Sequence, residues 1–330
     1  MQDLPHRGDR SPMHADVPLD GTSPPSSDEI RALATTLPPE ILFGTSSWTY
    51  PGWSGLIYHR KYPATGAGAR QLEEYARWPL FRTVGIDSSF YAPPTPATLD
   101  AYSAALPPGF RCVSKVWNQI TAHTFATPRS ARHGERNPDW LNAELFVRDV
   151  LDPMRQHFDD HIGPLVFEFQ AIARSSGVGG SEFAAALDTF FAQLPSDVPY
   201  AVEVRNAEFL VPEYFAVLRD HGVAHVFNSW TRMPSIGEQF LLPDAMTAPF
   251  IVVRALLKPG RTFDAAIDAF APYDRIRDVI PELRNDLVAV AHTAINLRIP
   301  AYVIVNNRTE GCSPLTIAAV AQMLLASAAA

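Results

Sequence analysis

The sequence is poor in cysteine. Its 330 residues contain two, Cys112 and Cys312, and neither belongs to a CxxC pair. Two cysteines cannot build a disulfide framework, and without CxxC pairs the sequence offers no zinc site of that type. Because disulfides are rare where thiols are kept reduced, we expect a cytoplasmic protein.

Long apolar runs and an excess of positive charge are also missing. No apolar segment approaches the ~18 residues that span a bilayer, so we expect no membrane partner. The net charge is -8 and the isoelectric point is about 5.7. This acidic balance disfavours general attraction to nucleic acid, although a local basic groove would still permit that partner.

The first 28 residues contain no hydrophobic segment and are rich in Pro, Ser and Asp. They do not resemble a secretory signal. Such a segment cannot bury enough apolar surface to offset its ordering entropy, so we predict a disordered tail over residues 1–28, with a docking peptide as the alternative. The remainder, 29–330, has no internal repeat and no linker after residue 40, which indicates a single domain.

Short apolar runs of strand length, rich in Val, Ile and Phe, recur along the rest of the chain. They are ILFGTSSW (41–48), TVGIDSSFY (83–91), RCVSKVW (111–117), GPLVFEFQ (163–170), YAVEVRN (200–206), AHVFNSW (224–230), FIVVRAL (250–256) and AYVIVNN (301–307). Helical patterns separate most of these runs. Such alternation predicts parallel strands joined by right-handed crossovers.

Eight strands alternating with about as many helices predict an α/β fold, a (β/α)8 TIM barrel. A doubly wound open sheet is the competing fold, but it usually has fewer strands, and its glycine-rich fingerprint is missing after the first run. Within the helical patterns we expect caps at Thr95, Ser181 and Ser313, and a stop at Gly222. Pro281 is expected to break or kink the helix around it, and residues 231–249 show only a weak helical pattern.

Polar and aromatic side chains gather on one face of most runs, toward their C-terminal ends. Since residues i and i+2 of a strand share a face, this face would line the barrel lumen, where the C-terminal ends carry chemistry. The residues are Trp48, Asp87, Tyr91, Lys115, Trp117, Glu168, Glu203, Arg205, Asn228, Trp230, Arg254, and Asn306 or Asn307, depending on register. We therefore predict a ligand site at the barrel mouth. Its charges should be paired, because a lone buried charge is too costly.

Several ordered motifs resemble those of the DUF72, or YecE-like, family. They are FGTSSWTYPGWSGLIYHRKYP (43–63), VGIDSSFYAPPTPATLDAYSAALPPGFRCVSKV (84–116), YAVEVRN, IVVRA (251–255) and VIVNN (303–307). The resemblance covers residues 41 to 325 and implies a TIM barrel without an established reaction. Four positions depart from the family pattern: Asp87 replaces a glutamate, Ser88 an asparagine, Glu168 a glutamine and Leu256 a histidine. Chemistry that depends on that histidine would be missing here.

Three functions remain open. In the first, the mouth binds a small anionic ligand through Lys115, Arg205 and Arg254, because cationic side chains clamp phosphate and carboxylate groups; phosphodiester cleavage in nucleic acid belongs here by fold analogy. In the second, Glu203 and Glu168, with Asp87 nearby, act as catalytic carboxylates on a sugar. In the third, the barrel binds a ligand without chemistry.

No cofactor and no metal is indicated. Three histidines, His123, His133 and His161, fall in connections or at a strand start, and His225 should face away from the lumen. A transition-metal site needs histidine and carboxylate ligands brought together, and the pattern does not do this. The sequence specifies neither an oligomeric state nor whether the protein is an enzyme.

Overall fold

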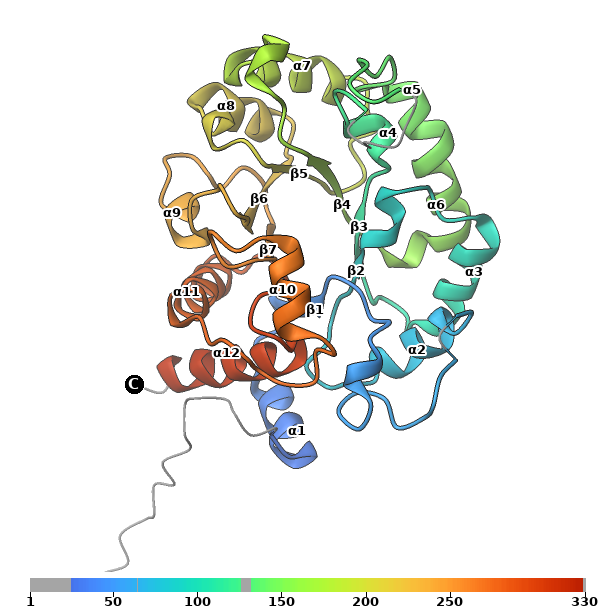
Figure 1. The fold of residues 1–330 in the computed structure, drawn as a ribbon, viewed down its shortest axis with the longest axis vertical. Helices are drawn as coiled ribbons and strands as arrows, with labels where there is room; N and C mark the ends of the chain where they lie inside the picture. Colours follow the sequence, from blue (N-terminus) through green and yellow to red (C-terminus); the bar gives the residue numbers. More distant parts are fainter. Residues whose placement is uncertain (1–24, 64, 126–131, 329–330) are drawn as a thin grey trace, which may run out of the picture.

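The computed structural model describes residues 25–63, 65–125 and 132–328. These residues form a single-domain (β/α)8 barrel, with parallel strands at the centre and helices around them (Figure 1). Most of the predicted tail, residues 1–24, lies outside the described residues. The first helix already begins at Ser27, and Ser26 and Glu29 form its capping box.

The strands of the described chain form one eight-stranded sheet in the order β1-β8-β7-β6-β5-β4-β3-β2. They are β1 (Ile41–Thr45), β2 (Gly85–Ile86), β3 (Cys112–Lys115), β4 (Ile162–Phe169), β5 (Tyr200–Val204), β6 (Ala224–Ser229), β7 (Ile251–Ala255) and β8 (Ala301–Val305). All the neighbouring pairs that are hydrogen-bonded are parallel. The predicted TIM barrel is confirmed.

The barrel closes at the seam between β1 and the segment that leads into β2. The backbone N–H groups of Arg82 and Thr83 donate to the Phe43 carbonyl at 2.9 and 3.3 Å. A Cβ atom at Gly44 would lie 2.2 Å from the carbonyl oxygen of Thr83, and one at Gly85 would lie 2.9 Å from Cα of Ser46. Only glycine permits so close an approach of two backbones, and the two glycines therefore allow the ring to close.

The lumen has an apolar lower part and a charged upper part. Val166, Val226, Val252 and their neighbours fill the lower part as a separate hydrophobic cluster. Two residues further along each strand, the same face carries Glu168 opposite Glu203 and Asn228 opposite Arg254. The alternation of strand faces thus places the charges at the C-terminal end of the barrel, as predicted.

Helices surround the strands, and α10 lies inside their ring in the view of Figure 1. They are α1 (Ser27–Thr36), α2 (Gly68–Tyr75), α3 (Pro96–Ala105), α4 (Asn118–Thr121), α5 (Ala143–Phe146), α6 (Asp152–Phe158), α7 (Gly180–Phe191), α8 (Pro212–Asp220), α9 (Ile236–Phe240), α10 (Phe263–Phe270), α11 (Pro281–Leu297) and α12 (Ser313–Ala328). Thr95 caps α3 and Gly222, at φ +64°, follows α8, as predicted. No helix in the described part of the chain is long and apolar enough to cross a membrane.

Some helix predictions were wrong. Gly179 caps α7 in place of Ser181, since the Glu182 side chain accepts the Gly179 N–H at 3.1 Å. Pro281 begins α11 and does not interrupt it; proline suits the first turn because its missing N–H would have no partner there. Between β3 and β4 the chain forms α5, a π-helical segment (Val147–Leu151) and α6 in succession. Helix α10 was not predicted.

Candidate functional site

A cavity of about 480 Å³ opens at the C-terminal ends of the strands. Its volume falls within the range of small-molecule sites. Its lining includes Ser46, Asp87, Tyr91, Lys115, Glu168, Arg205, Trp230, Arg254, Phe263, Asn306 and Arg308. The predicted site residues therefore converge largely on one cavity.

Arg254 lines the cavity and is 1% exposed. Its Nη1 donates to Glu203 Oε2 at 2.6 Å and to Glu168 Oε2 at 3.3 Å. Its Nη2 donates to both carboxylate oxygens of Asp87, at 2.9 and 2.7 Å. Both terminal nitrogens of this guanidinium are thus occupied by carboxylates.

Arg205 and Lys115 complete the charge pairing. Arg205 Nη2 lies 2.6 Å from Glu203 Oε1 and 3.1 Å from Glu168 Oε2. Lys115 Nζ lies 2.6 Å from Glu168 Oε2 and 3.5 Å from an oxygen of Asp87. We call the six residues the barrel ion network: Asp87, Lys115, Glu168, Glu203, Arg205 and Arg254. Three cations meet three carboxylates, so the network is neutral overall.

The network keeps Glu168 ionised. Burial by itself would raise the pKa of this carboxyl, but the charges of Lys115, Arg205 and Arg254 outweigh burial and hold the pKa well below its usual range. Burial likewise opposes the charge of Arg254, and the surrounding carboxylates overcome it and raise the pKa of the guanidinium. Glu168 therefore carries no proton to donate near neutral pH.

Arg308 is the functional candidate that the sequence analysis missed. Its Nη1 donates to Asn306 Oδ1 at 3.3 Å, and its guanidinium lies 4.0 Å from the centroid of the Phe263 ring. Its Nε is buried and has no hydrogen-bond partner among the described residues, nor does Arg308 pair there with a carboxylate. Sequence patterns gave no signal for it, because β8 ends at Val305 and Arg308 lies in a turn, where strand alternation does not apply.

Ser46 provides a second donor without a partner in the same cavity. Its side chain is 2% exposed and lines the cavity, and its Oγ has no hydrogen-bond partner within the described chain. Ser46 follows β1 and Arg308 follows β8, and these strands are neighbours in the barrel. We call Ser46, Asn306 and Arg308 the β8–β1 corner.

Two of the three predicted tryptophans lie outside the cavity lining. Trp48 is buried against α3, with its ring 5.1 Å from Tyr102, and its Nε1 donates to the Gly68 carbonyl at 2.8 Å. Trp117 is half-buried against the main core, at the start of α4. Strands β1 and β3 end at Thr45 and Lys115, so strand alternation no longer sets the direction of these tryptophans. Trp230 directly follows β6 and lines the cavity, under the guanidinium of Arg205 at 4.1 Å.

Both predicted asparagines outside the cavity have structural partners. Asn307 is buried and its Oδ1 accepts the N–H and the hydroxyl of Ser313, each at 2.8 Å, at the start of α12. Of the two register alternatives, Asn306 faces the cavity and Asn307 does not. Asn228 is fully buried and accepts a hydrogen bond from Arg205 Nη1 at 3.4 Å.

None of the histidines that the structure describes lines the mouth cavity. His225 lies on the outer face of β6, where its Nδ1 is 3.0 Å from the Tyr214 hydroxyl of α8. In the described part of the chain, no group of three or more His, Cys, Asp or Glu side chains is arranged to hold a metal ion.

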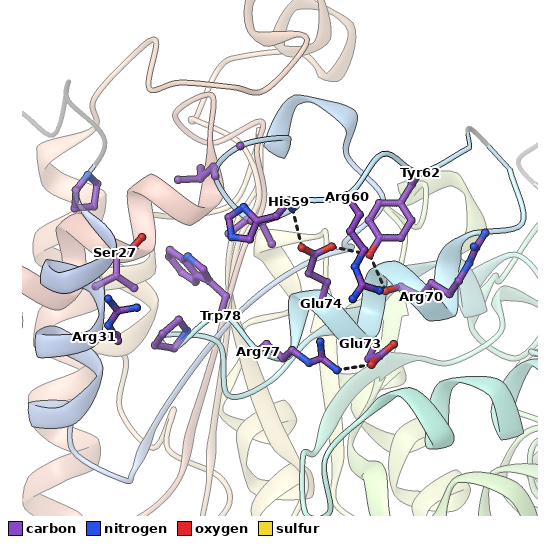
Figure 2. A pocket seen from close by; sticks show the side chains of 16 residues that line it. Ser27, Arg31, His59, Arg60, Tyr62, Arg70, Glu73, Glu74, Arg77 and Trp78 are labelled. Atoms are coloured by element: carbon purple, nitrogen blue, oxygen red, sulfur yellow. Dashed lines mark hydrogen bonds and ion pairs between the residues drawn. The ribbon is translucent and has the colours of Figure 1, made fainter.

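A second hollow, of about 520 Å³, lies between α1 and α2 (Figure 2) and shares no lining residue with the mouth cavity. Its charged pairs are at the surface: the side chains of Arg31 and Asp28 are 63% and 90% exposed, and those of Arg77 and Glu73 are 64% and 44% exposed. Such pairs contribute little because water screens them. The mouth cavity, with its buried charges and unpartnered donors, is therefore the candidate site.

Comparison with known proteins agrees with this architecture. The family described as "Protein of unknown function DUF72" matches residues 42–330. A DUF72 family protein from Enterococcus faecalis V583 superposes with a TM-score of 0.60 at 17% identity, over 86% of this chain and 95% of that chain. One from Thermotoga maritima MSB8 gives a TM-score of 0.58 at 19% identity, over 86% and 99%.

The search of curated proteins finds no match. The two solved structures share the fold of this chain, and the family match extends over nearly all of it. The chain therefore belongs to the DUF72 family of proteins of unknown function.

Proposed function

We propose that the mouth cavity binds a small anionic ligand, which bears a phosphate or a carboxylate group, at the β8–β1 corner. The observation that carries the proposal is the charge of Arg308. The barrel ion network is neutral by itself, and Arg308 adds one cation with a buried, unpartnered Nε beside it. A buried donor without a partner is costly, and an anion would remove that cost.

The location of the corner supports an anion. Phosphate sites of TIM barrels lie preferentially in the loops after the seventh and eighth strands. Arg308 follows β8, and Phe263, on which it rests, follows β7. We place the anion here and not between Arg205 and Arg254, because the terminal nitrogens of Arg254 already bind carboxylates.

A carboxylate-based hydrolase receives less support. Glycoside hydrolysis needs one carboxyl that holds a proton and one that is free to attack or to activate water. Glu168 is held ionised, and Glu203 is fully buried and bound by Arg254 and Arg205. We accordingly assign the network carboxylates to charge pairing, with binding and not hydrolysis as the activity to test first.

Thermal unfolding and calorimetric titration with inorganic phosphate, sulfate and acetate test the proposal. We expect at least one anion to stabilise the wild-type protein, and Arg308→Gln to weaken its binding about tenfold or more, since a hydrogen bond to a charged group contributes about 1.5–3 kcal/mol. Arg70→Gln is the matched control, because Arg70 is exposed at the other hollow. Equal anion binding by wild type and Arg308→Gln would refute the proposed site.

We further propose a cytoplasmic location. Cys112 and Cys312 are unpaired and buried, and burial raises the pKa of the Cys312 thiol to about 12. Thiols that stay protonated and unpaired suit a reducing compartment.

A further inference from the structure

We infer that the ligand of the mouth cavity is an amphipathic anion: its charged group binds the β8–β1 corner, and an aromatic ring or a similarly flat apolar part of it contacts Tyr91 and Phe263. This inference rests on the proposed function and adds the chemical class of the ligand. The observation that supports it is that the side chains of Tyr91 and Phe263 are exposed at the mouth cavity.

Large hydrophobic side chains are seldom exposed in the described part of the chain. Those that are exposed are Tyr91 (76%), Leu241 (83%), Phe263 (44%) and Leu297 (56%). Tyr91 and Phe263 both line the mouth cavity. Exposed apolar surface at the rim of a polar cavity is characteristic of a binding surface, because burying it on a ligand is favourable.

The order of the strands places these aromatic residues on either side of the β8–β1 corner. Around the barrel the sequence of strands is β7, β8, β1 and then the seam to β2. Phe263 follows β7, the corner residues follow β8 and β1, and Tyr91 follows β2. An anion at the corner therefore has an aromatic side chain in the loop on each side.

Each of the two aromatic side chains has an aromatic or cationic neighbour. Phe263 begins α10 and carries the Arg308 guanidinium over its ring at 4.0 Å. Tyr91 contacts Phe90 edge to face, with ring centroids 5.4 Å apart, and the Phe90 ring lies 5.0 Å from Lys115 Nζ. A cavity of about 480 Å³ has room for an anionic group and a ring together.

Three probes separate the contributions of ring and charge to affinity: phenyl phosphate, glycerol 3-phosphate and inorganic phosphate. We expect calorimetry to show that phenyl phosphate binds wild type about tenfold tighter than glycerol 3-phosphate, since aromatic contacts contribute roughly 0.5–1.5 kcal/mol beyond the area that they bury. Tyr91→Ala should remove most of this preference and leave the binding of inorganic phosphate unchanged. Phe263→Ala should also lower the preference, but it should weaken inorganic phosphate as well, because its ring lies beneath the guanidinium of Arg308. Leu241→Ala is the control, an exposed apolar side chain elsewhere.

Each other outcome has a defined meaning. If inorganic phosphate and glycerol 3-phosphate bind as tightly as phenyl phosphate, the inference fails while the proposed anion site stands. If none of the three binds the wild type, both fail. If Leu241→Ala lowers the preference as much as Tyr91→Ala and Phe263→Ala do, the aromatic contact is overturned. Comparison of the three probes on wild type does not depend on the folding of any variant.

Discussion

Arg254 shows how the chemistry of one residue depends on its partners. It is buried, and its terminal nitrogens bind Asp87, Glu168 and Glu203. Strand alternation indicates that this arginine faces the barrel lumen, but it does not show that the side chain is paired with carboxylates and so not free to clamp a ligand. Whether a buried cation is free or paired depends on distances to residues 51, 86 and 167 positions away, which no local pattern contains.

Removal of Arg254 is therefore expected to destabilise the protein. Arg254→Ala leaves three carboxylates, two of them buried, with two cations, and breaking a buried pair in this way costs about 3–5 kcal/mol. Chemical denaturation should show a free energy of unfolding lowered by this amount, with Arg70→Ala close to wild type. If Arg254→Ala unfolded at the same denaturant concentration as the wild type, the barrel ion network would not stabilise the fold.

His225 links the strand β6 to the helices outside it. Its ring lies between the Tyr214 hydroxyl, at 3.0 Å, and Gln239 Oε1, at 3.3 Å. Burial lowers the pKa of His225 to about 4, and the hydrogen bond to Gln239 opposes this only in part. The contact of strand and helices therefore requires a neutral imidazole.

Acid should weaken this contact. In the unfolded chain histidine takes up its proton near pH 6.5, and in the folded chain only near pH 4, so the unfolded state binds more protons between these values. The free energy of unfolding should fall by roughly 2–3 kcal/mol between pH 7 and pH 4.5 because of His225. His225→Gln should lose that part of the pH dependence. If the free energy of unfolding fell equally with pH in the wild type and in His225→Gln, this pH dependence would not come from His225.

Sequence patterns predicted the strands and most helices, but not what happens at the strand ends. The run 83–91 forms only a two-residue strand, and Asp87–Phe90 turns into a 3-10 helix. That turn brings Asp87 to Arg254, a tertiary contact that outweighs the local β propensity. The predicted directions of the Trp48 and Trp117 side chains were wrong because both residues lie beyond the end of their strand, where the alternation of faces no longer holds.

At the scale of the whole molecule, the barrel follows from the regular alternation of apolar runs and helical patterns. The small lumen residues, the glycines at the seam and the polar strand ends all agree with it. Arg308 could not be identified from the sequence, because the relevant feature is a buried Nε without a hydrogen-bond partner. Only the folded chain shows which groups have partners. Four positions that depart from the family motifs, Asp87, Ser88, Glu168 and Leu256, all line the mouth cavity.

The N-terminal boundary gives a test of the whole domain. Deletion of residues 1–24 should change the free energy of unfolding by less than ~1 kcal/mol, because their composition offers little apolar surface to bury. Deletion through Glu29 should cost about 1 kcal/mol more, since it removes the capping box of α1. Equally small losses in both deletions would show that the capping box adds nothing to stability and would place the domain boundary after Glu29.

The most direct measurement of the central claim is the position of a bound anion. Anomalous diffraction from a crystal soaked in selenate, a phosphate-like anion, locates the selenium atom without reference to any assumed site. We predict a selenate whose oxygens lie about 3 Å from Arg308 Nε and Ser46 Oγ, at hydrogen-bond distance. Selenate bound only at the exposed arginines between α1 and α2, with none in the mouth cavity, would contradict the account.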